Sequence, residues 1–358
     1  MRLRPPRFRP SLPSSVILCA PCGWAVDFRN LQSNMPQTAD PAEIDHAAQL
    51  LRAGRLVAFP TETVYGLGAN ALDAEAVARI YAVKRRPLTS PLIVHVASTE
   101  MTQSLVADWP EAAERLARVF WPGPLTLVVK KQSKIPDIVT AGLSTVAVRM
   151  PAHPIAQALI RAARVPLAAP SANRFTQLSP TTADHVRHSL GSDVDLILDG
   201  GPCQVGIEST VLSLAETIPT LLRPGGISRP QLEAIIGPIA SAPEVQAGAH
   251  PSPGLHPRHY SPRTTLYLAP NGKLPDQGQE QAQGEGQGIY LQHRHPPSRT
   301  NITIHQMPES AADYAAALYD VLHQADAGNY HWIAVDLPPS TPEWEAIHDR
   351  LRRAGSNS

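Results

Sequence analysis

The sequence predicts a mixed α/β protein with a second, smaller α/β domain towards the C-terminus. Short apolar strands alternate with amphipathic helices over residues 38–237, and some of these strands follow one another directly. The alternation resumes after residue 262. A length of 358 residues also gives room for two domains of roughly 150 residues each.

The first helix has the clearest boundaries. Asp40 supplies an acidic cap, Pro41 occupies the first helical position, and apolar residues recur at helical spacing from Ile44 to Leu51. Gly54 then ends the helix. By the same criteria, further helices are expected at 74–84, 111–120, 154–163, 181–190 and 230–236. Strands are expected at 56–59, 92–96, 125–129, 146–149 and 167–169, and near Leu196 and Val211.

A change in composition separates the two predicted domains. Residues 238–262 are rich in Pro, Ala, Gly, Ser and His, which is typical of an irregular linker. The C-terminal domain, residues 263–358, has a Gln- and Gly-rich stretch from 271 to 287, which we expect to be a flexible insertion. Its strands are expected at 265–268, 289–291, 302–304 and 332–335, and its helices at 311–325 and 343–353.

Residues 1–37 form a head of different composition. The first 34 residues hold five arginines, one acidic residue and two of the three cysteines. A secretory signal is disfavoured because Pro21 interrupts its apolar run, and an Arg-rich transit peptide because proline disrupts amphipathic helices. A third interpretation is that Met35 is the true initiator, since a well-capped helix begins soon after it. We expect this head either to be disordered or to lie upstream of the true start of translation.

Composition excludes several classes of protein. The 31 Lys and Arg residues balance 31 Asp and Glu residues, which argues against a general binder of nucleic acid. No apolar run approaches the ~20 residues needed to cross a bilayer, so we expect no membrane association. Three cysteines cannot staple a chain of this length.

Two basic residues are candidates for binding a polyphosphate. Lys84 and Arg86 end a predicted helix just before the apolar strand that contains His95. Basic residues at a helix C-terminus often only complement the helix dipole, but an arginine fork and a lysine point charge also suit phosphate oxygens. His95 by itself is more often a core histidine whose hydrogen bonds are satisfied.

Polar residues at strand ends form a second group of candidates. Residues 168–173 leave a strand with small side chains and two short polar ones, Ser171 and Asn173, at a place where open α/β sheets bind ligands. An ordinary turn explains this composition equally well. Ser179 begins a capped helix, and residues 206–210 and 222–226 combine Gly with Ser, Thr or Arg.

Other sites are weakly supported. The sequence Gly66-x-Gly68-x-x-Ala71, interpreted as a turn, lacks the acidic partner of a dinucleotide site, and no standard phosphate loop is present. His250, His256 and His259 match no familiar zinc spacing, so no metal ligands are predicted.

Taken together, eight ordered segments resemble the threonylcarbamoyl-AMP synthases in their two-domain form, whose catalytic unit is the YrdC-like domain. The resemblance spans about residues 40–237, and 252–262 and 346–354 resemble the linker and the C-terminal ending of the same family. The segments are 59–68, 84–87, 91–95, 121–126, 146–149, 169–173, 206–211 and 222–225.

The resemblance implies a YrdC-like twisted mixed sheet flanked by helices and a smaller C-terminal α/β domain of Rossmann-like type. It also implies a nucleotidyltransferase reaction. L-threonine and bicarbonate give N-carbamoylthreonine, whose carboxylate attacks the α-phosphate of ATP and releases pyrophosphate. A partner threonylcarbamoyl transferase then modifies tRNA. The resemblance further implies magnesium with the triphosphate, a cytoplasmic location and no need for stable nucleic-acid binding.

The resemblance also assigns roles to residues of this sequence. The catalytic residues would be Lys84, Arg86, Ser171 and Asn173. L-threonine would be bound by Thr63, His95, Arg149, Ser171 and Ser209, with Arg149 as the natural partner of a carboxylate. ATP would be bound by Lys84, Arg86, Ser90, Thr145, Ala169, Asn173, Ser179, Arg223 and Tyr260.

Two departures and two alternatives accompany the resemblance. Arg174 to Gln177 replaces a Ser-Gly that is common in the family, which leaves the local nucleotide contacts open. The linker has His256-Pro257-Arg258 where Lys or Tyr is common, but we still expect it to fold as a lid with Tyr260 on the nucleotide. The alternatives are an RNA-binding or ribosome-assembly module and carbamoyl transfer to another acceptor.

Overall fold

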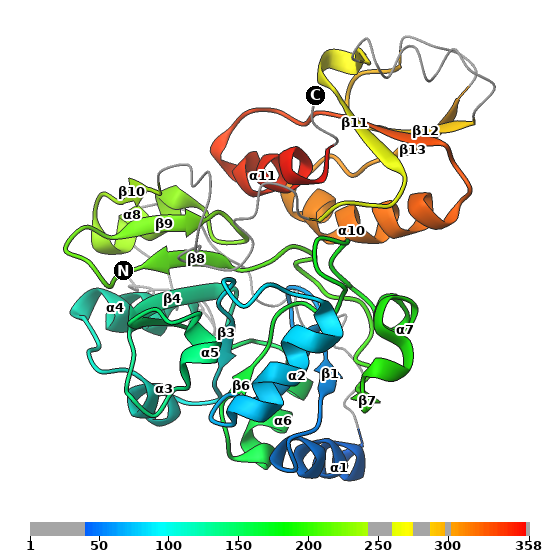
Figure 1. Ribbon diagram of the computed structural model, residues 1–358. Coiled ribbons are helices and arrows are strands. Elements are labelled where there is room, and N and C mark those ends of the chain that lie inside the picture. Colours follow the sequence, from blue (N-terminus) through cyan, green and yellow to red (C-terminus); the bar gives the residue numbers. More distant parts are fainter. Residues whose placement is uncertain (1–39, 243–259, 275–286, 298–301, 356–358) are drawn as a thin grey trace, which may run out of the picture. The chain divides into compact units, whose positions relative to one another are not determined.

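The computed structural model describes residues 40–242, 260–274, 287–297 and 302–355 (Figure 1). The N-terminal head, linker residues 243–259 with their three histidines, and insertion residues 275–286 lie outside the described residues. Within the described part, the predicted fold class is confirmed. A large mixed sheet flanked by helices is followed by a second domain with a parallel sheet.

The first domain contains ten strands and eight α-helices within the described residues. The helices are α1 Pro41–Arg52, α2 Ala74–Lys84, α3 Thr99–Leu105, α4 Glu111–Phe120, α5 Asp137–Thr140, α6 Pro154–Ala163, α7 Ala183–Leu190 and α8 Arg229–Ile236. The strands are β1 Val57–Phe59, β2 Gly66–Asn70, β3 Ile93–His95, β4 Leu125–Lys130, β5 Thr145–Arg149, β6 Leu167–Ala168, β7 Leu196–Ile197, β8 Thr210–Ser213, β9 Thr220–Arg223 and β10 Ala240–Ser241.

The sheet runs in the order β10-β9-β8-β4-β5-β3-β6-β2-β1-β7 and mixes parallel with antiparallel pairs. At its centre, β3 pairs with β5 in parallel, so that His95 lies opposite Arg149. Both residues are the last of their strands. The register therefore brings two predicted site residues to the same edge of the sheet.

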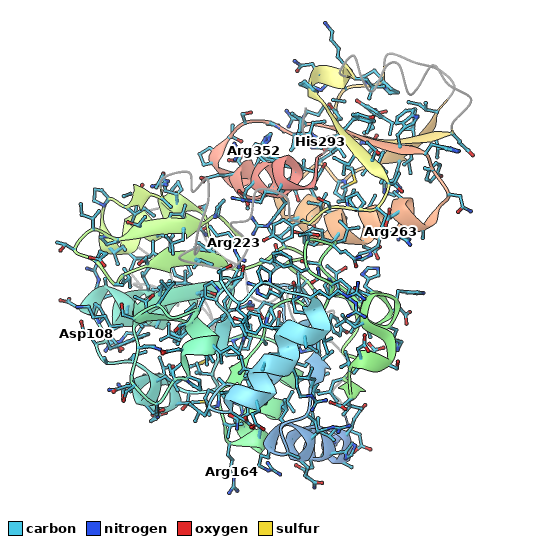
Figure 2. All side chains as sticks on the ribbon, viewed as in Figure 1. Asp108, Arg164, Arg223, Arg263, His293 and Arg352 are labelled. Carbon is cyan, nitrogen blue, oxygen red and sulfur yellow. The ribbon has the colours of Figure 1, made fainter. Side chains whose placement is uncertain are left out.

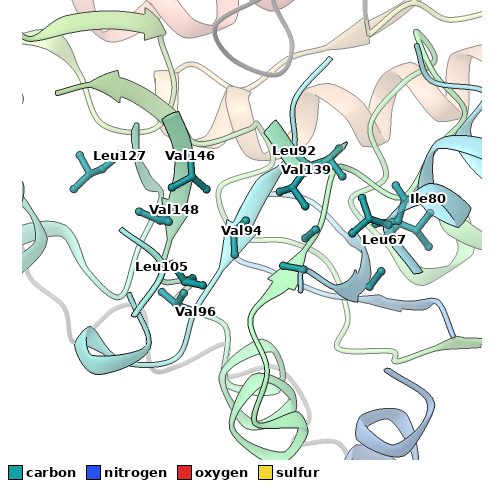
Figure 3. Packing of buried hydrophobic residues seen from close by; sticks show 14 of the residues in the cluster. Leu67, Ile80, Leu92, Val94, Val96, Leu105, Leu127, Val139, Val146 and Val148 are labelled. Carbon is teal, nitrogen blue, oxygen red and sulfur yellow. The ribbon is translucent and has the colours of Figure 1, made fainter. Parts of the chain in front are cut away.

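Alternating side chains place apolar residues on both faces of the sheet. Along the first strand region, Leu56 and Ala58 belong to the large cluster that includes residues of α2, α4, α7 and α8. Val57 and Phe59 belong to a separate cluster with α1 and α6. Strand residues of the large cluster such as Val94, Leu127 and Val148 are seen packed together in Figure 3. Burial of both faces explains the nearly continuous apolar runs of the central strands.

The end of α2 explains how two basic residues reach the inside of the protein. Asp73 caps the helix by accepting hydrogen bonds from the amides of Glu75 and Ala76. At the other end Arg85 adopts a left-handed conformation with φ 54°, which stops the helix. Lys84, just before this turn, and Arg86, just after it, are both buried.

The C-terminal domain contains a four-stranded sheet in the order β11-β14-β12-β13, in which every described pairing is parallel. Its strands are β11 Thr265–Ala269, β12 Gly288–Gln292, β13 Thr303–Gln306 and β14 Trp332–Asp336, and its helices are α10 Ala311–Ala327 and α11 Glu345–Ala354. These bounds agree with the expected elements to within a few residues.

Some elements differ from the expectations. Residues 66–70, interpreted as a turn because of their glycines, form β2, which pairs antiparallel with β1 and β6. Helices α3 and α5 and strand β9 were not expected. Strand β10 lies within the expected linker and pairs with β9, so the sheet continues to residue 241.

Candidate active site

A cavity opens where several strands of the large sheet end. Its walls come from segments far apart in the sequence: the loop after β1, the turn after α2, β3, the ends of β5 and β6, the segment before β8, the end of β9, and Tyr260. Nine of the predicted site residues line it, namely Thr63, Arg86, His95, Arg149, Ala169, Ser171, Ser209, Arg223 and Tyr260. The fold therefore brings most of the predicted site together.

Arg149 is held on one side of the cavity by polar contacts. Its Nη1 donates a hydrogen bond to Thr63 Oγ1 at 2.9 Å, and its Nε donates to the carbonyl of Gly123 at 3.2 Å. Its Nη2 lies 2.7 Å from Glu62 Oε1 in an ion pair that is almost fully buried. No role was predicted for Glu62, although it stands beside Thr63 in the first motif. A substrate carboxylate would share this guanidinium with Glu62.

His95 is a buried neutral histidine at the same side of the cavity. Burial and, secondarily, the positive charge of Arg149 lower the pKa of His95 to about 3. Among the described residues its Nδ1 has no hydrogen-bond partner. The ring lies edge-on to Phe59. An unpartnered ring nitrogen in a cavity is a ready hydrogen-bonding group for a substrate.

Lys84 does not line the cavity but lies directly behind one of its walls. Its Nζ donates a hydrogen bond to the carbonyl of Ser171 at 2.6 Å and another to the carbonyl of Asn173. Burial, with the charges of Arg86 and Arg174, places the pKa of Lys84 well below the usual lysine value. Lys84 thus fixes the 171–173 loop and has no carboxylate partner among the described residues.

Arg86 is the second buried cation of this wall. It donates hydrogen bonds to the carbonyls of Ser90, at 3.3 Å, and Pro91, at 3.0 Å. Its guanidinium lies 5.6 Å from the centre of the Phe175 ring. Phe175 belongs to the 174–177 segment that departs from the family pattern, and the structure places it against a predicted catalytic residue. No carboxylate pairs with Arg86 in the described part of the chain.

Ser209 and Arg223 line another part of the cavity. Arg223, labelled in Figure 2, donates to the Ser209 carbonyl from Nε at 3.1 Å and from Nη2 at 3.0 Å, and to Ser209 Oγ at 3.1 Å. Gly225 allows this arrangement, because a side chain there would meet the Thr210 backbone nitrogen at 2.3 Å. The arginine thus lies against the segment that precedes β8.

Ser179 does not line the cavity, but its side chain contacts Glu208. Its Oγ donates a hydrogen bond to Glu208 Oε1 at 2.5 Å, and Glu208 itself lines the cavity. Glu208 stands within one of the predicted motifs, but no role was predicted for it. Its other partners, Tyr319 and Arg350, are more than 100 residues away along the chain, and no local pattern indicates such contacts.

Three further predicted residues lie away from the cavity surface. Asn173 is buried, and its side-chain amide donates to the carbonyls of Arg174 and Gln177. Ser90 is buried and uses its carbonyl to accept from Arg86. Thr145 begins β5, whereas Arg149 at the other end of the same strand lines the cavity. The structure does not bring Thr145 together with the other predicted residues.

The described residues contain no group of three or more His, Cys, Asp or Glu side chains placed to hold a metal ion. Within the same residues, no helix has the length and apolar character needed to cross a membrane.

Comparisons with known proteins agree with this fold. Residues 49–225 match the Sua5_yciO_yrdC family model, described as telomere recombination, and residues 227–356 match the threonylcarbamoyl-AMP synthase, C-terminal domain. The threonylcarbamoyl-AMP synthase of Bacillus subtilis is 42% identical over 92% of this chain and 96% of its own length. That of Pyrococcus abyssi is 50% identical over 66% of this chain and 70% of its own length.

Solved structures give the same result. The crystal structure of P. abyssi Sua5 complexed with L-threonine has a TM-score of 0.81 and 39% identity, and the match covers 89% of this chain and 95% of that one. The fold and the cavity define an enzyme built on a YrdC-like catalytic domain with an attached C-terminal domain. The chain belongs to the threonylcarbamoyl-AMP synthase family.

Proposed function

We propose that this protein is a nucleotidyltransferase that makes L-threonylcarbamoyladenylate and pyrophosphate from L-threonine, bicarbonate and ATP. The product would supply a partner threonylcarbamoyl transferase for N6-threonylcarbamoyladenosine modification of tRNA. The relatives that carry this name, and the related structure described with L-threonine, support the proposal. They do not favour an RNA-binding module or carbamoyl transfer to another acceptor.

One observation carries the proposal most directly. Lys84 and Arg86 are two buried basic side chains that face no carboxylate in the described part of the chain, and they flank the 171–173 loop and the cavity. Isolated buried charges are costly unless a counter-ion is supplied. A triphosphate would provide the missing negative charge, and these cations would then neutralise the pyrophosphate as it leaves.

The other side of the cavity suits a small zwitterion. Thr63, His95 and Arg149 offer a hydroxyl, a neutral ring and a guanidinium within one buried surface. Threonine presents a carboxylate, an amine and a hydroxyl, which matches these groups in kind. Ser171, which also lines the cavity, would hold the carbamoyl and phosphate region, and Ser209 would contribute to the threonine site.

Magnesium would accompany the triphosphate, bound mainly by phosphate oxygens and water. The residues present fit this role, because the two carboxylates of the cavity are already paired with arginines. Glu62 faces Arg149, and Glu208 faces Arg350. The metal would supply charge neutralisation on the phosphates, while the protein residues named above bind and orient the substrates.

The test is pyrophosphate release from ATP, measured with and without L-threonine and bicarbonate. We expect release to require both, and to fall by at least about 100-fold in Lys84→Ala and in Arg86→Ala, since each loses transition-state charge stabilisation worth roughly 3 kcal/mol. Turnover without threonine, or full activity in both variants, would exclude the proposed reaction.

A further inference from the structure

Glu208 connects the cavity to the C-terminal domain. Its carboxylate accepts hydrogen bonds from three side chains: from Ser179 Oγ at 2.5 Å, from the Tyr319 hydroxyl at 3.1 Å and from Arg350 Nε at 2.7 Å. Ser179 belongs to the catalytic domain, but Tyr319 lies on α10 and Arg350 on α11. Two of the three partners that orient this cavity residue thus come from the C-terminal domain.

Arg350 contacts two residues of the cavity wall and the backbone next to a third. Besides the Glu208 carboxylate, its Nη2 donates to the carbonyl of Pro224 at 3.0 Å, next to Arg223, and its guanidinium lies 5.1 Å from the centre of the Tyr260 ring. Asp349 accepts a further hydrogen bond from Nη1 at 2.6 Å. The side chain is 1% exposed. An arginine in these contacts fixes geometry as well as charge.

The charges of this cluster are consistent with an ionised Glu208. Burial alone would raise its pKa, but the positive charges of Arg350 and Arg223 outweigh burial, so the pKa of Glu208 lies below its usual value. Without Arg350, less positive charge would stabilise the buried carboxylate of Glu208. Glu208 would then protonate or move, and Ser179 would lose its partner.

Apolar packing ties the same segments to the C-terminal core. Val64, Leu178 and Ile207 share a buried cluster with residues of α10, α11 and the parallel sheet. Gly206 lies so close to α10 that a side chain on it would meet the Ala315 carbonyl at 2.4 Å. The contact is therefore a packed interface, with the Arg350–Glu208 ion pair inside it.

We propose that Arg350 is a positioning residue for the nucleotide side of the site, through which the C-terminal domain sets the affinity for ATP. The proposal rests on the proposed function. The contacts of Arg350 explain why it should affect ATP binding and not threonine binding. Arg350 touches or orders Ser179, Tyr260 and the backbone beside Arg223, all predicted ATP residues. On the threonine side, the hydrogen-bond and ion-pair partners that Arg149 and Thr63 have among the described residues all belong to the catalytic domain.

The experiment measures binding of α,β-methylene-ATP and of L-threonine to the full chain by calorimetry, together with the KM for each substrate. Arg350→Met should weaken nucleotide binding by at least tenfold and leave threonine binding within twofold, and Arg350→Lys should fall between Arg350→Met and the unchanged protein. Arg352→Met is the matched control, because Arg352 lies on the same helix but is exposed. It should change neither affinity by more than twofold.

Leaving a buried charge without its partner can prevent folding. The double variant Glu208→Gln/Arg350→Met removes both charges and should show the same selective loss of nucleotide binding. Equal losses for both ligands, or unchanged nucleotide affinity in Arg350→Met or in the double variant, would overturn the role of Arg350. Failure of the unchanged protein to bind either ligand would instead overturn the proposed function before any variant is compared.

Discussion

The protonation of Lys84 should depend on what binds beside it. Burial and two neighbouring arginines lower its pKa well below the lysine value, so its neutral form gains weight in the free protein. A bound triphosphate would favour the cation. We therefore expect nucleotide binding to take up a proton at about pH 8.5, where the phosphates of ATP are already ionised.

Calorimetry in two buffers with different ionisation enthalpies measures this uptake. The observed binding enthalpy should depend on the buffer for the unchanged protein and should lose most of that dependence in Lys84→Met. Identical enthalpies in both buffers for the unchanged protein would show that Lys84 does not change its protonation on binding.

For His95, in contrast to Lys84, we expect no change of protonation on ligand binding. Because its pKa lies at about 3, the ring is neutral from pH 5 to pH 8 in the folded protein, and its contribution to threonine binding should not vary over that range. His95→Ala should weaken threonine binding about tenfold, equivalent to about 1.4 kcal/mol, and His95→Gln should weaken it less. A step in threonine affinity near pH 6.5 that His95→Gln abolishes would contradict this account.

Residue types and motif order predicted most of the cavity lining, but the partners of those residues were harder to foresee. Glu62 and Glu208 stand within the predicted motifs, yet their roles depend on Arg149 and Arg350, which the fold brings to them. Nothing in the local sequence marks the 142-residue separation between Glu208 and Arg350. Pairing of this kind follows from tertiary structure alone.

At the scale of elements, periodicity predicted the longer helices and the central strands well, because each buries a continuous apolar face. It failed where tertiary pairing overrides weak local preference. Residues 66–70 contain two glycines, which disfavour a strand, but β1 and β6 both pair with them. The short strand β10 likewise forms only because β9 offers a partner.

The close contact between the end of β9 and the start of β8 gives a prediction about stability. Gly225→Ala would place a side-chain carbon 2.3 Å from the Thr210 nitrogen, so backbone must move. We expect the free energy of unfolding to fall by about 1–3 kcal/mol. Pyrophosphate release should also fall, because Ser209 and Arg223 are displaced. Thermal unfolding and the activity assay measure both.

Gly226→Ala is the matched control for this variant. A side chain there would first meet Val205 Cγ1 at 3.1 Å, which is a side-chain atom that can adjust. Its cost should stay below that of Gly225→Ala. Equal effects of the two substitutions would mean that the close backbone approach at residue 225 is not important.

At the scale of the whole molecule, the balanced net charge conceals a mildly acidic chain after the arginine-rich head. A site for a polyphosphate must therefore be built locally, and the structure concentrates buried basic side chains around one cavity, namely Lys84, Arg86, Arg149, Arg223 and Arg350. The last of these belongs to the C-terminal domain, whose part in the site the sequence did not reveal.

A histidine pair between α7 and α10 should make the stability of the whole molecule sensitive to acid. His185 and His323 are stacked with ring centres 3.8 Å apart. Burial, followed by a neighbouring histidine in each case, lowers both pKa values to about 4, even though the aspartates nearby, Asp184, Asp320 and Asp326, act in the other direction. Both rings are therefore neutral in the folded protein above that pH.

The sign of the effect follows from linkage. As pH falls from 6.5 to 4, the unfolded chain takes up protons that the folded chain does not, so stability falls. His323→Gln should reduce this decrease by on the order of 1 kcal/mol, after allowance for partial solvent exposure at the pair. Unfolding curves at pH 6.5 and pH 4.5 measure it. An unchanged decrease in His323→Gln would rule out the pair as its source.

The central claim, that one cavity joins threonine, bicarbonate and ATP, is tested most directly by isotopic labelling. The full chain is incubated with [13C]bicarbonate, L-threonine, magnesium and ATP, and the nucleotide product is analysed by mass spectrometry. The account predicts threonylcarbamoyl-AMP one mass unit heavier than the unlabelled compound, formed together with pyrophosphate and lost in Arg86→Ala. Formation of ADP and phosphate, or of an adenylate that carries no label, would contradict it.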